Sequence, residues 1–175
     1  MRKIAEVAVT LIVVAVAAGL LLIYFNYGSG TLEIKLNDSS NDWSQATQVY
    51  LNCSEIEIHQ AQASRESGWF TILDKNAWID LTRILNINRT IGYADLRPGS
   101  YDLIRFKISD AHVVVGEQNL TASVMPNNEM IAAISSGIHV NTGRTTKVLI
   151  EIQVNIEETE TNDLTLIPTV KAEEI

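Results

Sequence analysis

The chain has 175 residues, 13 of them basic and 21 acidic, and carries a formal net charge of −8 at pH 7. This length allows one ordinary domain with a sizeable core, and the acidity argues against nucleic acid as a partner. A single cysteine, Cys53, excludes a disulfide within the chain. Cys53 is in phase with Val49 and Leu51, which predicts a buried apolar side chain rather than a reactive thiol.

The N-terminal stretch contains an uncharged apolar run from residue 7 to residue 25. As a helix this run would be about 29 Å long, which is close to the hydrocarbon thickness of a bilayer. Arg2 and Lys3 precede it and aromatic residues follow it, an arrangement typical of a cytoplasmic N-terminus. We therefore predict a single-pass transmembrane helix in residues 1–27, with bilayer contact through residues 7–25 and the main domain outside the cell.

The same N-terminus has a second interpretation. The basic pair is followed by Ala5, Glu6 and a long apolar run, and this order resembles the N-terminus of archaeal type IV pilin-like and archaellin-like proteins. The resemblance implies that a peptidase cuts the leader between Ala5 and Glu6. It also implies a filament subunit whose apolar helix forms the filament core. The alternative is a retained anchor, with Glu6 at the level of the lipid headgroups.

Residues 28–30 form a short Gly/Ser joint, and residues 31–175 form the predicted extracytoplasmic domain. Apolar and polar residues alternate through this domain, and turn sequences such as Arg97-Pro98-Gly99-Ser100 separate the alternating stretches. A phase slip near Ser54-Glu55 predicts a bulge, and residues 81–87 suit a short helix. We predict an all-β fold, an antiparallel β-sandwich of about nine strands. The expected strands cover residues 31–36, 49–58, 69–73, 78–81, 101–109, 112–115, 118–124, 138–156 with a turn at 141–144, and 164–170.

Several short motifs are shared with a known family. The domain resembles archaeal and bacterial cell-surface domains that are catalogued only as a domain of unknown function. The resemblance implies a β-sandwich outside the cell behind an anchor, and it implies no activity. The motifs that carry it are residues 30–38, Ser67-Gly68-Trp69, Ile79-Asp80-Leu81, residues 96–101, residues 111–115 and the closing segment 164–170 with Pro168.

Glu55, Glu57 and His59 occupy alternate positions and so point to one face of a strand. Two carboxylates and an imidazole on one face are a candidate set of ligands for a divalent metal. The alternative is the solvent face of a strand whose other face carries Ile56 and Ile58. We expect no metal and no cofactor, and keep the three residues as the metal candidates.

Four asparagines begin an N-x-S/T sequence and are candidates for N-glycosylation. These are Asn37, Asn52, Asn88 and Asn119. Asn37 and Asn88 are expected in turns, which favours them over Asn52 within a strand.

Six aromatic residues could form a sugar-stacking platform, although aromatic side chains in a sandwich of this size are more often part of the core. They are Trp43, Trp69, Trp78, Tyr50, Tyr93 and Tyr101.

No serine, histidine or carboxylate pattern marks a catalytic site, so we expect no enzyme. We predict a membrane-anchored surface protein with a structural, adhesive or binding role. Its expected partners are copies of itself, other surface proteins or glycans. The alternatives are a filament subunit, or a surface enzyme or metal-dependent binder that uses Glu55, Glu57 and His59.

Overall fold

The computed structural model describes residues 2–38, 43, 46–74, 76–84, 87–158 and 163–175, and within the first helix it describes the side chains of residues 10–23. The chain begins with a helix, α1 (Arg2–Tyr27), and a single 3₁₀ turn, η1 (Leu81–Ile84), lies among the strands. The strands are β1 (Gly30–Asp38), β2 (Ala46–Gln60), β3 (Trp69–Leu73), β4 (Ala77–Asp80), β5 (Arg89–Leu96), β6 (Gly99–Val115), β7 (Gln118–Val124), β8 (Glu129–Val140), β9 (Thr145–Glu158) and β10 (Leu164–Glu174).

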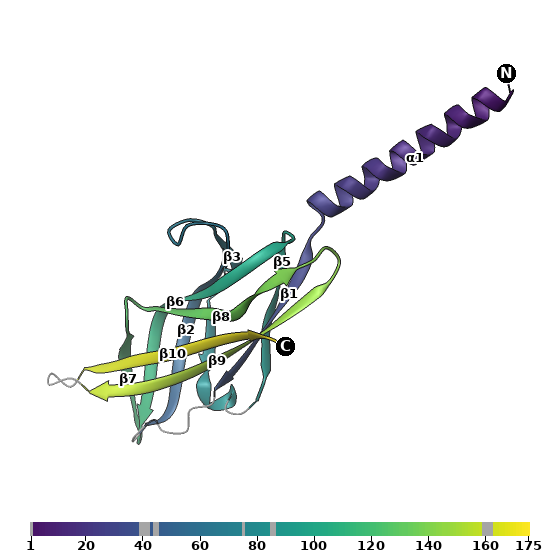
Figure 1. Ribbon diagram of the computed structural model, residues 1–175. Helices are drawn as coiled ribbons and strands as arrows, with labels where there is room; N and C mark the ends of the chain where they lie inside the picture. Colours follow the sequence, from purple (N-terminus) through teal and green to yellow (C-terminus); the bar gives the residue numbers. More distant parts are fainter. Residues whose placement is uncertain (1, 39–42, 44–45, 75, 85–86, 159–162) are drawn as a thin grey trace.

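All ten strands belong to one continuous sheet, whose main order is β3-β2-β6-β7-β10-β9-β1-β5. β4 pairs with β2 beside β3, and β8 pairs with both β6 and β10. Figure 1 shows this sheet folded over on itself, with α1 extending away from one end. Among the strands that the structure describes, two edges of the sheet are therefore open, one formed by β3 and β4 and the other by β5.

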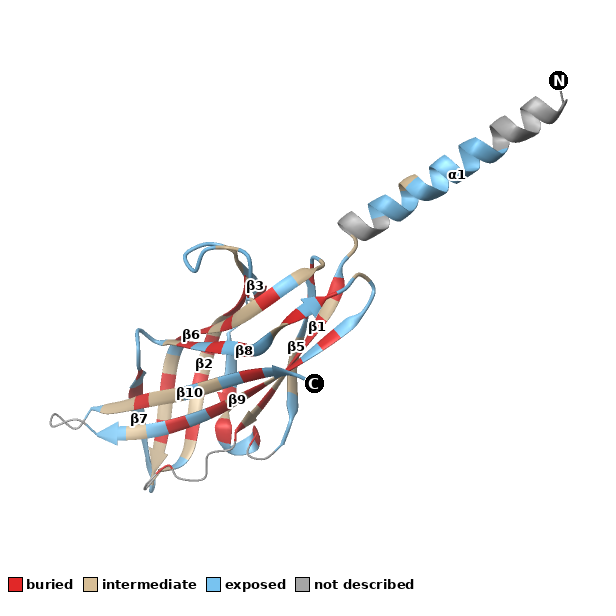
Figure 2. Ribbon diagram, in the orientation of Figure 1, coloured by how far each residue is buried: buried red, intermediate tan, exposed pale blue. Residues whose placement is uncertain are grey.

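Alternation along the long strands builds the core between the folded parts of the sheet. β2 and β6 bury Leu51, Ile58, Ile104 and Phe106, each at most 1% exposed. β1 and β9 alternate in the same way between buried and more accessible positions, as the banding in Figure 2 shows. Such alternation is what a strand produces when one face packs on a core and the other meets solvent.

The all-β prediction is confirmed, and several elements differ in detail. Residues 101–109 and 112–115 belong to one long strand, β6. Of the helix expected at 81–87, residues 81–84 form the 3₁₀ turn η1, and residues 85–86 lie outside the described residues. The bulge near Ser54-Glu55 is present as register shifts between β2 and β6. β5 and most of β8 were not predicted, because their sequences carry small and polar residues in place of a clear apolar alternation.

The prediction of a purely antiparallel sandwich is wrong. β1 runs parallel to β9, and β10 runs parallel to both β7 and β8. These pairings join segments that are far apart in the sequence, and turn signals reveal only the hairpins between neighbouring strands. The result is one mixed sheet of ten strands.

The prediction of a transmembrane helix in residues 1–27 is also corrected. The chain forms α1 there, but among the described residues no helix is both long enough and apolar enough to cross a membrane. The predicted orientation, with the N-terminus in the cytoplasm, rested on that helix and loses its basis.

Candidate functional site

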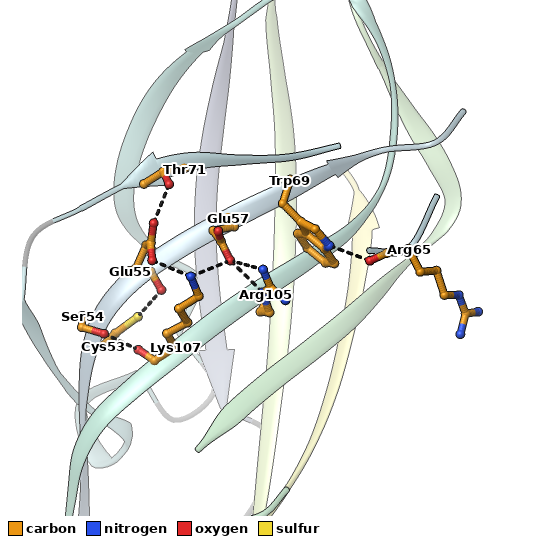
Figure 3. Close-up of polar contacts among 9 residues, drawn as sticks. All are labelled: Cys53, Ser54, Glu55, Glu57, Arg65, Trp69, Thr71, Arg105 and Lys107. Atoms are coloured by element: carbon orange, nitrogen blue, oxygen red, sulfur yellow. Dashed lines mark hydrogen bonds and ion pairs between the residues drawn. The ribbon is translucent and has the colours of Figure 1, made fainter. Parts of the chain in front are cut away.

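A row of acidic and basic side chains lies on the outer face of β2 and β6 (Figure 3). The Lys107 ammonium lies 2.7 Å from a carboxylate oxygen of Glu55 and 3.2 Å from one of Glu57. Arg105 donates from Nε to Glu57 at 2.7 Å, and the Thr71 hydroxyl donates to the other oxygen of Glu55. The side chains thus pair in a continuous line across β3, β2 and β6.

These contacts shift the pKa values of the groups that make them. The hydrogen bonds from Lys107 and Thr71 lower the pKa of the Glu55 carboxyl, and the hydrogen bond to Glu55 raises the pKa of the Lys107 ammonium. The row ends at Trp69, where the Arg105 guanidinium lies over the indole at 4.2 Å from the ring centroid. Each charge in the row has a partner, which is typical of a structural patch.

The predicted metal ligands lie within this row and next to it. β2 brings Glu55 and Glu57 to one face, but Lys107 bridges their carboxylates and His59 turns to Asp102. Across the described ranges, no group of three or more His, Cys, Asp and Glu side chains is arranged to hold a metal ion. A cation bound by Glu55 and Glu57 would have to displace the Lys107 ammonium.

The His59 side chain links the loop after β2 to strand β6 through hydrogen bonds. Its side chain is 2% exposed, with Nδ1 2.7 Å from a carboxylate oxygen of Asp102 and Nε2 2.9 Å from the carbonyl oxygen of Ser64. Both neighbours are acceptors, so the ring satisfies both of them only as the doubly protonated imidazolium. Burial lowers the pKa of His59, but the hydrogen bonds to Asp102 and Ser64 outweigh burial, and the net pKa is raised.

The six aromatic residues predicted as a platform are divided between core and surface. Trp43 and Tyr101 are buried, and burial raises the pKa of the Tyr101 hydroxyl. Arg105 covers one face of the Trp69 ring, so that face is not available to stack on a sugar. The other three lie on three different strands: half-buried Tyr50 on β2, Trp78 on β4 at 53% exposure, and Tyr93 on β5 at 63% exposure.

The four sequon asparagines also differ in access. Asn88 and Asn119 are exposed, whereas Asn37 and Asn52 are half-buried. The expectation that Asn37 lies in a turn is wrong, because β1 continues through it to Asp38. The Asn37 side-chain nitrogen donates to the Asn88 side-chain oxygen at 3.0 Å, so two candidate acceptors share one hydrogen bond. Ser39, which completes the Asn37 sequon, lies outside the described residues. Access favours Asn88 and Asn119, and glycosylation itself stays a prediction.

One serine–histidine contact has no signal in the sequence. The register of β6 against β8 sets Ser100 opposite His139, with the hydroxyl oxygen 3.1 Å from Nδ1 of the ring. In a hydrolase triad a carboxylate orients the histidine. In the part of the chain that the structure describes, no carboxylate contacts the His139 ring, so the contact lacks the third member of a triad.

The best candidate for a binding site is a cleft between the two open edges of the sheet. At one point the edges touch, because the Leu73 side chain of β3 packs on Gly92 of β5, where an added Cβ would lie 2.9 Å from a Leu73 methyl carbon. Next to this contact a cleft of about 440 Å³ opens, lined by residues of β2, β4, η1 and the start of β5. Small-ligand sites typically have volumes of roughly 300–1,000 Å³.

The cleft has an apolar floor and a polar rim. Burial of the Cys53 thiol raises its pKa to about 11, so this floor residue stays protonated at neutral pH, and the prediction of a buried apolar cysteine is confirmed. The floor residues, all buried in the core, are Cys53, Ile56, Ile79 and Ile84. The more accessible polar residues are Asn76, Asp80, Arg89 and Thr90.

Ala77 shows that the interior face of the sheet is uncovered at the cleft. It pairs directly with Cys53, so both side chains point to the interior face of the sheet. Cys53 is buried and so is Ile79, two residues after Ala77, yet Ala77 is exposed. Sequence patterns did not reveal this cleft, because its lining comes from separate strands that only the sheet pairing brings together.

Comparison with known proteins identifies the family. Residues 29–168 match the family described as "Domain of unknown function (DUF4382)", and the chain belongs to that family. This confirms the predicted resemblance to a domain family of unknown function; no comparison shows the archaeal or pilin-like resemblance. No curated protein matches the chain.

Two solved structures are distantly similar, and both carry the name "putative cell adhesion protein". One, from Bacteroides fragilis NCTC 9343, has 10% identity and a TM-score of 0.32; the alignment covers 81% of this chain and 45% of that one. The other, from Bacteroides ovatus ATCC 8483, has 10% identity and a TM-score of 0.21, with coverage of 82% and 44%. The chain thus spans less than half the length of either protein.

Proposed function

We propose that this member of the DUF4382 family is a non-catalytic binding domain that acts at the cell surface and holds its ligand in the cleft between β4 and β5. The observation that carries the proposal is the cleft itself, about 440 Å³ with an apolar floor and polar rim. Concave apolar sites with a few polar groups at the edge are the usual form of a ligand site. The exposed, inward-facing Ala77 supports an open site.

The state of the reactive side chains supports binding rather than catalysis. The carboxylates of Glu55 and Glu57 are held by Lys107 and Arg105, so neither is poised as a free acid or base. The Cys53 thiol is protonated at neutral pH. These groups stabilise the domain, and the proposal gives them no role in chemistry.

A location at the cell surface is supported by the sequons. Asn88 and Asn119 are exposed and available to a glycosylation machinery, which acts on proteins outside the cytoplasm. An adhesive role is the form of binding that we favour at such a location. Intact mass of the protein purified from its own cells, before and after glycan release, tests whether these asparagines carry glycans.

The cleft is tested with the dye 8-anilinonaphthalene-1-sulfonate, whose apolar rings suit the floor and whose sulfonate suits Arg89. We expect the folded protein to enhance the dye fluorescence, and the variant Ala77→Phe, which fills the cleft, to lose most of that enhancement. Ala133→Phe is the matched control, because Ala133 is exposed on β8 and does not line the cleft. Equal dye binding by both variants would contradict the proposal.

A second candidate, a subunit of a surface filament, is favoured by one observation on α1. Its described apolar side chains are largely exposed, among them Leu11 at 65% and Leu22 at 64%. Apolar surface of this extent is stabilised when it is buried against another surface. Packing against the same helix of other subunits would bury it. A mass of the mature protein that begins at Glu6, together with filaments in negative-stain images, would support this candidate; a mass that includes Arg2 would count against it.

A further inference from the structure

We infer that the occupant of the cleft is an extended peptide segment of a partner, which pairs with the open edge of β4 or β5 and carries a carboxylate that meets Arg89. The inference rests on the proposed function and adds the class of ligand. Three observations on the described residues carry it: two strand edges without a strand partner, an apolar floor between them, and one arginine without an ion pair.

The first observation concerns backbone pairing. Among the described strands, β4 pairs with β2 alone and β5 pairs with β1 alone. The other edge of each strand carries backbone N–H and C=O groups without a strand partner, and both edges border the cleft. A fatty acid or a small apolar molecule fits an apolar floor but cannot pair with such edges. An extended peptide does both.

The second observation concerns the spacing of the inward-facing side chains along β4. Ala77 and Ile79 are two residues apart on β4 and share the interior face, and Ile79 and Ile56 belong to the apolar floor. A strand places every second side chain on one face, about 6.8 Å apart. A peptide with apolar residues at alternate positions therefore presents them to the floor while its backbone follows β4.

The third observation is the charge of Arg89. In the β1–β5 register Arg89 lies opposite Leu36, which is fully buried. Residues opposite each other point to the same face, so the Arg89 side chain leaves the backbone on the interior face, as that of Ala77 does. It is exposed, and none of the described residues forms an ion pair with it. The other charged group of the lining, Asp80, is neutralised by Arg83 at 3.1 Å. Among the described lining residues the cleft thus offers one positive charge without an ion pair, in a chain of net charge −8, and this favours a carboxylate on the occupant.

The test is an NMR titration of the ¹⁵N-labelled protein with a capped eight-residue peptide that alternates Thr with Val and has one central Glu. Three probes are compared with it: the same peptide with Gln in place of Glu, the same peptide with one central Val replaced by Pro, and dodecanoate. We expect saturable shifts at residues 77–80 and 89–91 with the Glu peptide. The Pro peptide, which lacks one N–H, should bind more weakly.

Two variants sharpen the result. Ala77→Phe should lower affinity for the Glu peptide about tenfold or more, and Ala133→Phe should leave it unchanged. Arg89→Gln should lower affinity about threefold for the Glu peptide and leave the Gln peptide unaffected. The ¹⁵N spectra of the free variants show directly whether each of them folds.

The outcomes separate this inference from the proposed function. If dodecanoate shifts residues 77–80 and 89–91 and the peptides do not, or if the Pro peptide binds as well as its parent, the peptide assignment is overturned and the cleft remains a binding site. If neither dodecanoate nor the Glu peptide shifts these residues, and the dye also fails to distinguish Ala77→Phe from Ala133→Phe, both proposals are overturned.

Discussion

Two regions next to β2 differ in whether their charged and inward-facing side chains have partners within the described part of the chain. On the outer face of β2 and β6, each charge in the row from Glu55 to Arg105 is paired. In the cleft beside β4, Ala77 faces the interior and is exposed, and Arg89 forms no ion pair with the described residues. Paired groups stabilise a fold, whereas uncovered groups are available to a partner. The difference therefore separates the part of the sheet that supports the domain from the part that can bind.

Loss of Glu57 should be the most destabilising change in the paired region. Glu57→Ala leaves Arg105 without its ion pair and Lys107 with one partner; the side chains of Glu57 and Arg105 are only 10% and 21% exposed. We expect the free energy of unfolding to fall by about 3 kcal/mol. Urea denaturation measures it, with Glu57→Gln as the control that keeps the side-chain shape. A loss below about 0.5 kcal/mol would show that the row is not structural.

His59 should make stability depend on pH. The folded-state pKa of His59 is raised, so its contribution is complete below the unfolded pKa, about 6.5, and is lost as pH rises through the folded-state value. The free energy of unfolding should therefore fall as the pH rises above about 6.5. His59→Gln should lower stability by about 2 kcal/mol at pH 5.5 and remove most of this dependence.

The decisive comparison is between the stability of the wild type and that of His59→Gln at each pH. Asp102 on β6 and the Ser64 carbonyl are the acceptors that face the His59 ring, and the Arg105 guanidinium lies on the neighbouring Trp69. Asp102→Asn should reduce the pH dependence while the ring stays in place. If His59→Gln shows the same dependence on pH as the wild type, the dependence comes from other groups.

Glu55 should matter less than Glu57, although both contact Lys107. Its side chain and that of Lys107 are more accessible to solvent, at 28% and 36% exposed, and solvent screens their attraction. We expect Glu55→Ala to lower the free energy of unfolding by less than about 1 kcal/mol. Denaturation in low and high salt tests whether the Glu55–Lys107 pair is accessible to solvent, because an accessible pair loses its small contribution to stability as salt rises.

Changes in the cleft should leave stability almost unaffected. Arg89→Gln removes no described ion pair, and Ala77→Phe adds apolar area in an open space. Each should change the free energy of unfolding by no more than about 0.5 kcal/mol, although both alter binding. A large loss of stability in Arg89→Gln would place this side chain in the structural part of the sheet and weaken its assignment to a partner.

The sequence predicted the fold class because alternation is a local property. Residues 145–156 alternate through almost their whole length, and the strand β9 follows them closely. The hairpin around Gly116-Glu117 was equally visible, and it joins β6 to β7. Turn residues and alternation report on neighbours in the chain, so these elements could be predicted.

The long-range features could not be predicted from such patterns. The parallel pairing of β1 with β9 joins residues more than one hundred positions apart, and no local motif encodes it. The metal hypothesis placed Glu55 and Glu57 correctly on one face, but nothing in the sequence showed that Lys107 lies between them. The cleft lies where the described residues of β4 and β5 do not pair with each other, which only the assembled sheet reveals.

The most direct test of the central claim, that the sheet is open between β4 and β5, is native-state hydrogen exchange of the free protein. We predict that amides on the free edges in residues 77–80 and 89–91 exchange much faster than those of the β2–β6 pairing, and become protected when the Glu peptide is added. Strong protection of both edges in the free protein would mean that the sheet is closed between β4 and β5, and would contradict the proposed binding site.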